Sequence, residues 1–312
     1  MRCIGIIGAM SDEVAGLKAL MQDTQIIRKA SMEFYSGILE GKKVVVVQSG
    51  IGKVNAAVCT QILIDDFQAE VVINTGIAGS LNNDINIGDI VVSTDLVHHD
   101  VDAGAFGYKK GQVPDMDVFS FGSDDALRSL AVKVCREVNP DIQVFEGRIA
   151  SGDQFVADQG VKDVIVSEFG AYAVEMEGAA IAHAAYLNHV PCLVVRAISD
   201  KADGSAEVDY PAFEKLAIEH SMKLTRRILR EMSHSLKKKS GISRSLSMYY
   251  DEFFPFYAAY ADPLLYEREN IQEKEFALMK SWYPESVRRL QERVEQECQL
   301  LDYEGSRIYD EY

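Results

Sequence analysis

Two glutamates stand in an otherwise apolar segment, where a carboxylate is costly to bury and is usually kept for contact with a ligand. Glu175 and Glu177 flank Met176, and small residues at helical spacing follow. In an extended strand every second side chain points to the same face, so both carboxylates would face one side. The segment predicts a pair of acids at the end of a buried strand. The alternative is that Glu177 only caps the next helix.

A second polar group follows the apolar run 192–195. Arg196, Ser199 and Asp200 come directly after this run. Open α/β sheets bind their ligands at the carboxyl ends of strands, so these side chains are candidates for a ligand site. In the alternative interpretation, Asp200 only begins a turn.

A third acid, Glu13, follows the short apolar strand 4–10 in an acid-rich helix start. The glycine-rich turn before it suggests a dinucleotide site. However, GxGxxG is absent, and Asp12 and Glu13 stand where a pyrophosphate would need bare amides. Glu13 therefore either stabilises the helix dipole, which the residues alone favour, or faces a ligand.

The elements that must position these acids alternate along the first 232 residues. Strand-like runs lie at 4–10, 33–37, 43–48, 71–79, 89–93 and 144–150, and helical patterns lie at 53–67, 124–138 and 210–232. The run 71–79 is expected to break into a tight turn of small residues. The alternation predicts an α/β fold, a three-layer sandwich in which helices cover both faces of a mixed central sheet.

Two further motifs are weak signals. The glycine loop 49–53 is similar to a phosphate cradle but lacks the full GxxxxGK[ST] pattern. His98, His99 and Asp100 are potential metal ligands, but adjacent strand side chains point to opposite faces and cannot easily meet at one ion. We therefore expect neither a metal nor a cofactor.

The composition limits the partners and the compartment. The 312 residues carry a formal net charge of −16, which would repel nucleic acids and anionic membranes. The five cysteines are far apart and show no CxxC spacing, as in a reduced protein. The chain starts directly with a strand and has no run long enough to cross a bilayer. These features predict a cytoplasmic protein with a small-molecule or protein partner.

The amino-acid composition changes after residue 232. Residues 233–247 form a basic, serine-rich segment that predicts a linker. Residues 248–312 are acidic and rich in aromatic residues, and they predict a small, mainly helical extension of unknown role. The extension could dock on a protein partner or on the first domain, or it could pack only on itself.

The first 232 residues closely resemble the 5′-methylthioadenosine/S-adenosylhomocysteine nucleosidases of the nucleoside phosphorylase superfamily. Four blocks carry the resemblance: 6–10 with Glu13, 48–57, 174–177 and 194–200. Residues 74–76, 105–108 and 151–153 add to it. Because the blocks occur together and in this order, they form a specific signal for the nucleosidase domain 1–232.

The resemblance implies irreversible hydrolysis of the N-glycosidic bond of 5′-methylthioadenosine and S-adenosylhomocysteine. It implies the same reaction with 5′-deoxyadenosine and a role of the enzyme in methionine salvage. Asp200 would be protonated and would protonate N7 of the leaving adenine. Glu177 would hold the ribose hydroxyls, and nearby carboxylates would stabilise the oxocarbenium charge on the ribose. Glu13 would accept a proton from the attacking water, while Arg196 would order that water and Glu177.

The resemblance also implies a substrate pocket and a homodimer. The expected pocket residues are Ile51, Ala78, Gly79, Phe155, Val156, Met176, Ser199 and Tyr210. Phe106 and Pro114 would reach the pocket of the neighbouring subunit. At Ile77 many relatives carry a small or hydroxyl residue, and Tyr210 replaces the more usual phenylalanine.

Two other functions compete with hydrolysis. A phosphorylase on the same fold would use phosphate as the nucleophile, but Glu13 would place a negative charge beside it. A nucleoside sensor acting through the extension would need no acid above N7.

Overall fold

A computed structural model describes residues 3–200 and 210–232, with side chains in the second segment from residue 214 onward. The expected linker 233–247 and extension 248–312 lie outside the described residues and stay predictions.

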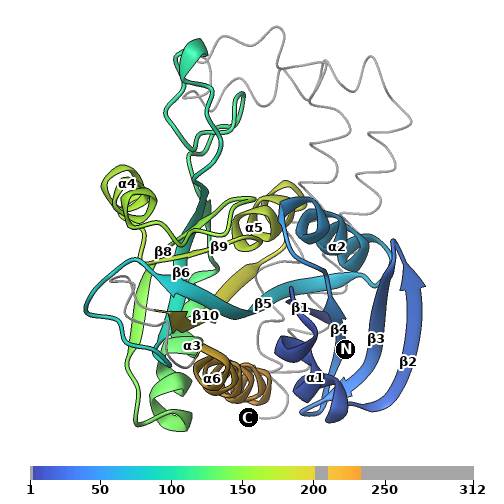
Figure 1. Cartoon of the computed structure of the whole chain (residues 1–312). Helices are drawn as coiled ribbons and strands as arrows, with labels where there is room; N and C mark the ends of the chain where they lie inside the picture. The colour runs from blue at the N-terminus through green and yellow to red at the C-terminus, as the bar shows by residue number, and fades with distance from the viewer. Residues whose placement is uncertain (1–2, 201–209, 233–312) are drawn as a thin grey trace, which may run out of the picture. The chain divides into compact units, whose positions relative to one another are not determined.

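One mixed β-sheet forms the centre of the described part (Figure 1). Its strands are β1 (Cys3–Gly8), β2 (Gln22–Lys29), β3 (Met32–Leu39), β4 (Lys42–Gln48), β5 (Ala69–Ser80), β6 (Ile90–His98), β7 (Phe121–Gly122), β8 (Val144–Ser151), β9 (Ala173–Glu175) and β10 (Cys192–Asp200). Neighbours follow the order β10-β6-β8-β9-β5-β1-β4-β3-β2, and β7 pairs with β6. Because β10 also pairs with β5, the strands β5, β10, β6, β8 and β9 form a closed circuit of pairings.

Helices cover both faces of this sheet. They are α1 (Ser11–Ala19), α2 (Lys53–Asp65), α3 (Asp125–Val138), α4 (Gln159–Phe169), α5 (Gly178–Leu187) and α6 (Tyr210–Glu231), with a short 3₁₀ turn, η1, at Gly104–Phe106. Figure 1 shows α2 beside α5 on one face and α1 and α6 on the other. Among these helices, none combines the length and apolar character that crossing a bilayer requires.

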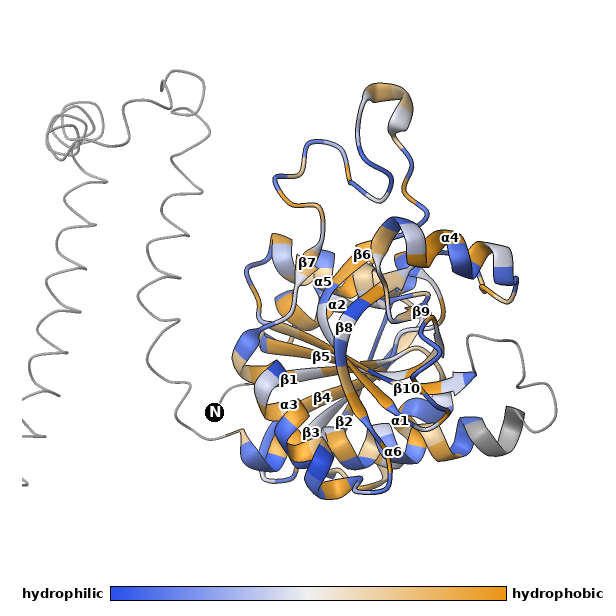
Figure 2. Ribbon diagram, turned by 90° about the vertical axis from the view of Figure 1, so that its left-hand side faces the viewer, coloured by the Kyte–Doolittle hydropathy of each residue, from blue (hydrophilic) through white to orange (hydrophobic). Residues whose placement is uncertain are grey.

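The valine run in β4 shows why the fold has three layers. Val45 and Val47 pack in the core cluster that includes α2 and α5, and Val44 and Val46 pack in the cluster of α1, α3 and α6. A strand that is buried on both faces reads as a continuous apolar run, because alternate side chains enter opposite layers. Figure 2 shows this apolar interior along the strands. The predicted three-layer α/β fold is confirmed.

The expected turn in 71–79 is wrong. Strand β5 continues without a break from Ala69 to Ser80, since its glycine-rich end pairs with β10 on one side and with β9 on the other. The small residues there allow two strands and several buried side chains to approach the backbone closely.

Candidate active site

A cavity of about 140 Å³ lies where β5, β9 and β10 end, beside the first residues of α1 and α2. It is lined by ten of the residues named from the sequence: Glu13, Ile51, Ala78, Gly79, Phe155, Val156, Met176, Glu177, Ser199 and Asp200. Gln154, Glu175 and Ile77 also line it. The structure thus brings three acids from distant parts of the chain to one small cavity.

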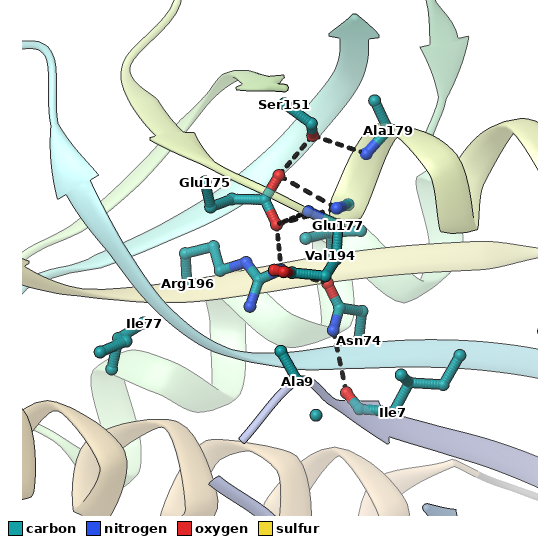
Figure 3. Close-up of polar contacts among 12 residues, drawn as sticks. Ile7, Ala9, Asn74, Ile77, Ser151, Glu175, Glu177, Ala179, Val194 and Arg196 are labelled. Atoms are coloured by element: carbon teal, nitrogen blue, oxygen red, sulfur yellow. Dashed lines mark hydrogen bonds and ion pairs between the residues drawn. The ribbon is translucent and has the colours of Figure 1, made fainter. Parts of the chain in front are cut away.

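Arg196 lies behind this cavity and is fully buried. Its Nη2 donates to Oδ1 of Asn74 over 2.6 Å and to Oε2 of Glu175, and it lies 3.6 Å from Oε2 of Glu177. Asn74 in turn donates to the carbonyl oxygen of Ile7 over 2.9 Å. Figure 3 shows these contacts as one connected chain. The guanidinium is therefore held from both sides and faces the carboxylates.

The carboxylates also keep Arg196 ionised. Burial alone would lower the pKa of Arg196, but the charges of Glu175, Glu177 and Glu13 raise it above its ordinary value. A buried arginine among carboxylates is stable only as a cation, so it supplies a permanent positive charge behind the cavity.

Glu175 also lines the cavity, and the sequence alone assigns it no role. Its carboxylate accepts from the amides of Glu177 and Gly178, from the hydroxyl of Ser151 and from Arg196. These contacts bind the turn between β9 and α5 to β8 and β10, so Glu175 holds Glu177 in place. The signal that could have found it is the buried acid itself, which requires several partners.

Glu177 presents its carboxylate to the cavity from the N-cap position of α5, and its side chain makes no capping hydrogen bond. Its Oε1 accepts from the amide of Gly52 over 2.9 Å. Burial, with the charge of Glu175, raises the pKa of Glu177 to about 7, while Arg196 and the Gly52 amide oppose the rise. Near neutral pH this carboxyl can therefore hold or release a proton.

Glu13 both binds the amides at the start of α1 and faces the cavity, so it combines the two roles that the sequence left open. Its Oε2 accepts from the amides of Ala9 and Met10 over 2.7 and 2.9 Å at the start of α1. Its Oε1 accepts from the amide of Ile77 in β5 over 3.0 Å and the side chain lines the cavity. Gly76 makes this possible, because a Cβ atom there would collide with both Glu13 and Arg196.

Asp200 is the last residue of β10, and its side chain is about one quarter exposed. The hydroxyl of Ser199 donates to its Oδ1 over 3.1 Å. The ammonium of Lys162, on α4, lies 3.4 Å from its Oδ2. No motif in the sequence marks this lysine as a site residue.

Two residues named from the sequence, Phe106 and Pro114, are not part of the cavity lining. Phe106 is 84% exposed and Pro114 is exposed. Tyr210 is the first residue of α6, and its side chain is outside the described part of the chain.

The glycine loop 49–53 binds carboxylates of the protein itself. Gly52 has φ +98°, in the left-handed region that favours glycine. This backbone aims the amide of Gly52 at Glu177, and the amide of Lys53 donates to Oδ1 of Asp153 over 2.7 Å. The start of α2 is therefore fixed to the wall of the cavity.

The side chains of His98 and Asp100 have separate partners. Nε2 of His98 lies 3.3 Å from Nδ1 of His183. Asp100 binds Nζ of Lys53 over 2.6 Å and accepts from the amide of Asp153 over 2.9 Å. Asp100 thus ties the loop before Phe155 to the start of α2.

The fold and the site correspond to one class of protein. Residues 3–231 match the family model described as the Phosphorylase superfamily. A 5′-methylthioadenosine/S-adenosylhomocysteine nucleosidase of Bacillus licheniformis is 44% identical over 231 residues, which are 74% of this chain and 99% of the relative. One of Staphylococcus aureus is 46% identical over 220 residues, which are 70% of this chain and 95% of the relative.

Solved structures agree with these relatives. The nucleosidase of Neisseria meningitidis in complex with methylthio-immucillin-A has a TM-score of 0.70 and 39% identity, covering 74% of this chain and 100% of that one. Futalosine hydrolase of Helicobacter pylori has a TM-score of 0.69 and 38% identity, covering 74% and 98%. The chain belongs to the 5′-methylthioadenosine/S-adenosylhomocysteine nucleosidase family, as the resemblance predicted.

Proposed function

We propose that this protein hydrolyses the N-glycosidic bond of 5′-methylthioadenosine and S-adenosylhomocysteine, and also that of 5′-deoxyadenosine. The products are adenine and the ribose that keeps the 5′ substituent of the substrate. The reaction would serve methionine salvage in the cytoplasm. The observation that carries this proposal is that Glu13, Glu177 and Asp200 line one cavity. The reaction needs a proton donor and a base that activates water, and these three acids can supply both.

Each acid has a separate task in this proposal. Asp200 gives a proton to N7, so that adenine leaves as a neutral base. Glu177 holds the ribose hydroxyls, and the carboxylates stabilise the oxocarbenium charge on the ribose. Glu13 accepts a proton from the attacking water. Arg196 orders Glu177, which is supported by the 3.6 Å approach of its Nη2 to Oε2 of Glu177.

A homodimer would complete the site. Ile51 and Phe155 line the cavity, yet they are 54% and 75% exposed. A second subunit that contributes Phe106 and Pro114 would cover them and exclude water from the bound nucleoside. The expected result in solution is a dimer by light scattering.

A second candidate substrate is futalosine. The similarity to a futalosine hydrolase suggests it. A larger hollow of about 460 Å³ shares Ala9, Met10 and Ile51 with the cavity, which leaves room for a substrate that extends beyond the cavity. Comparing kcat/KM for methylthioadenosine, S-adenosylhomocysteine and futalosine would rank these substrates.

The test of the proposed function is release of adenine by the purified full-length protein, with and without inorganic phosphate. We expect release that does not depend on phosphate. Absolute dependence on phosphate would instead identify a phosphorylase. Binding of methylthioadenosine without release would identify a sensor.

The extension needs an experiment of its own. Residues 233–312 lie beyond the family match, which ends at residue 231. Removing them and comparing dimer mass and turnover tests whether the extension acts on the first domain. No change in either would rule out a role of the extension on the first domain.

A further inference from the structure

A buried lysine lies against the proposed proton donor. Lys162 is only 4% exposed, and its Nζ is 3.4 Å from Oδ2 of Asp200. Asp200 lies in the block 194–200 that carries the family resemblance, whereas Lys162 lies outside all of these blocks.

The sequence of α4 directs this lysine inward. Asp158 caps the helix by accepting from the amide of Val161 over 3.0 Å. Lys162, Ile165 and Phe169 follow at spacings of three and four, and all three are buried. Residues at these spacings share one helix face, so the ammonium is carried by the face that packs on the core. A buried ammonium is costly without polar partners, and the carboxyl group of Asp200 is one group within reach of it.

Charges of both signs lie around Asp200. The ammonium of Lys162 is next to its Oδ2. Glu13 and Glu177 line the same cavity, and Glu175 is paired with Arg196. Ser199, which donates to Oδ1 of Asp200, is uncharged.

We infer that Lys162 is a positioning residue that acts through Asp200, orienting its carboxyl group and stabilising the carboxylate that remains after proton transfer. The inference rests on the proposed function. In that step the O–H bond of Asp200 breaks and an N7–H bond forms. The electron pair of the glycosidic bond passes to the adenine, water adds its oxygen to the ribose carbon, and Glu13 takes the water proton. The charge left on Asp200 lies beside the Lys162 ammonium.

This arrangement has two opposing consequences. Stabilising the product carboxylate makes Asp200 a better proton donor once it is protonated. The same attraction must be overcome when the free enzyme takes up the proton that it will transfer, so loss of the lysine should change the dependence of activity on pH. The profile of kcat/KM against pH reports the free enzyme and therefore contains both effects.

The experiment measures kcat/KM for adenine release from methylthioadenosine between acid and alkaline pH. Lys162→Met removes the charge but keeps the length of the side chain. We expect its acid-side plateau to fall about tenfold, because part of the general-acid contribution is lost. We also expect its decline to begin at higher pH, so that the fraction of its own plateau kept at alkaline pH exceeds that of the wild type by about tenfold.

Three further variants make the test specific. Lys162→Arg keeps the charge and should keep the shape of the wild-type profile. Lys29→Met removes an exposed lysine paired with Asp66 over 2.6 Å and should leave the profile unchanged. Lys162→Gln, with the same expectation as Lys162→Met, replaces that variant if it does not fold.

The outcomes separate the inference from the proposed function. A uniform loss in Lys162→Met at every pH, with no change in the shape of the profile, would mean that the lysine is only structural and would overturn the inference. No adenine release from the wild type would overturn the proposed function itself.

Discussion

Gly79 of β5 pairs with Asp200 of β10, and a Cβ atom at position 79 would lie 2.9 Å from Oδ2 of Asp200. The carboxyl group therefore occupies the space that a side chain on β5 would need. Gly79 also pairs with Val174 of β9, so this glycine marks the point where the two strands beside the cavity meet β5.

Gly79→Ala is expected to displace the Asp200 carboxyl group. Since proton transfer depends on a geometry set within about 1 Å, kcat for adenine release should fall by about 10²-fold. The matched control is Gly122→Ala in β7, where a Cβ atom meets no other atom within 4 Å. A Gly79→Ala enzyme with wild-type kcat would show that Asp200 is not held by this contact.

Asp200→Asn should abolish most of the turnover, because an amide cannot deliver the proton that N7 needs. The expected loss in kcat is about 10²- to 10⁴-fold. Single-turnover adenine release measures it, and an unchanged circular dichroism spectrum confirms folding. The control is Asp163→Asn, an exposed aspartate on α4. Turnover that survives in Asp200→Asn would assign the proton to another group.

Glu177→Gln should separate stability from activity. Burial raises the pKa of Glu177 to about 7, from an ordinary 4.5. A carboxyl with a raised pKa stabilises the fold at low pH, and this contribution is lost as the pH rises through the folded pKa. The glutamine removes that loss, so we expect a higher Tm than wild type above pH 7 and little adenine release.

The control for this variant is Glu137→Gln, a glutamate whose side chain is 43% exposed in its pair with Arg227. Its Tm should follow the wild type across the pH range. A Tm for Glu177→Gln below the wild-type value at alkaline pH would contradict the unfavourable ionisation of Glu177.

Acid should destabilise the protein through His98. Burial, with the charges of Lys53 and His183, lowers the pKa of His98 from 6.5 to about 4. Folding therefore favours the neutral ring, and stability is lost as the pH falls from 6.5 towards 4. The loss amounts to about 3 kcal/mol.

His98→Gln, which cannot take up a proton, should flatten this dependence. Urea unfolding at pH 7 and pH 4.5 measures it. The pKa values of His99 and His183 are lowered by burial in the same direction, so part of the slope should remain. An identical slope in wild type and variant would remove His98 as its source.

Strands, helices and acids could be predicted from the order of residues, because periodicity and burial cost are local properties. The valine run of β4 and the acids at 175 and 177 are examples. The uninterrupted strand over 71–79 could not be predicted, and the turn expected there is wrong. Its glycines suggest a break, whereas strands β9 and β10, distant in sequence, extend it.

The partners of the carboxylates could be found only in the folded chain. The amide of Gly52 reaches Glu177 across 125 positions of sequence, and Asn74 meets Arg196 across 122. Local sequence patterns do not show which residues so far apart along the chain will meet. The order of residues was thus enough to name the acids of the site, and the packing of strands and helices chose which charge stands beside each one, including Lys162 at Asp200. Electrostatic interactions depend on separation in space, and the fold sets that separation.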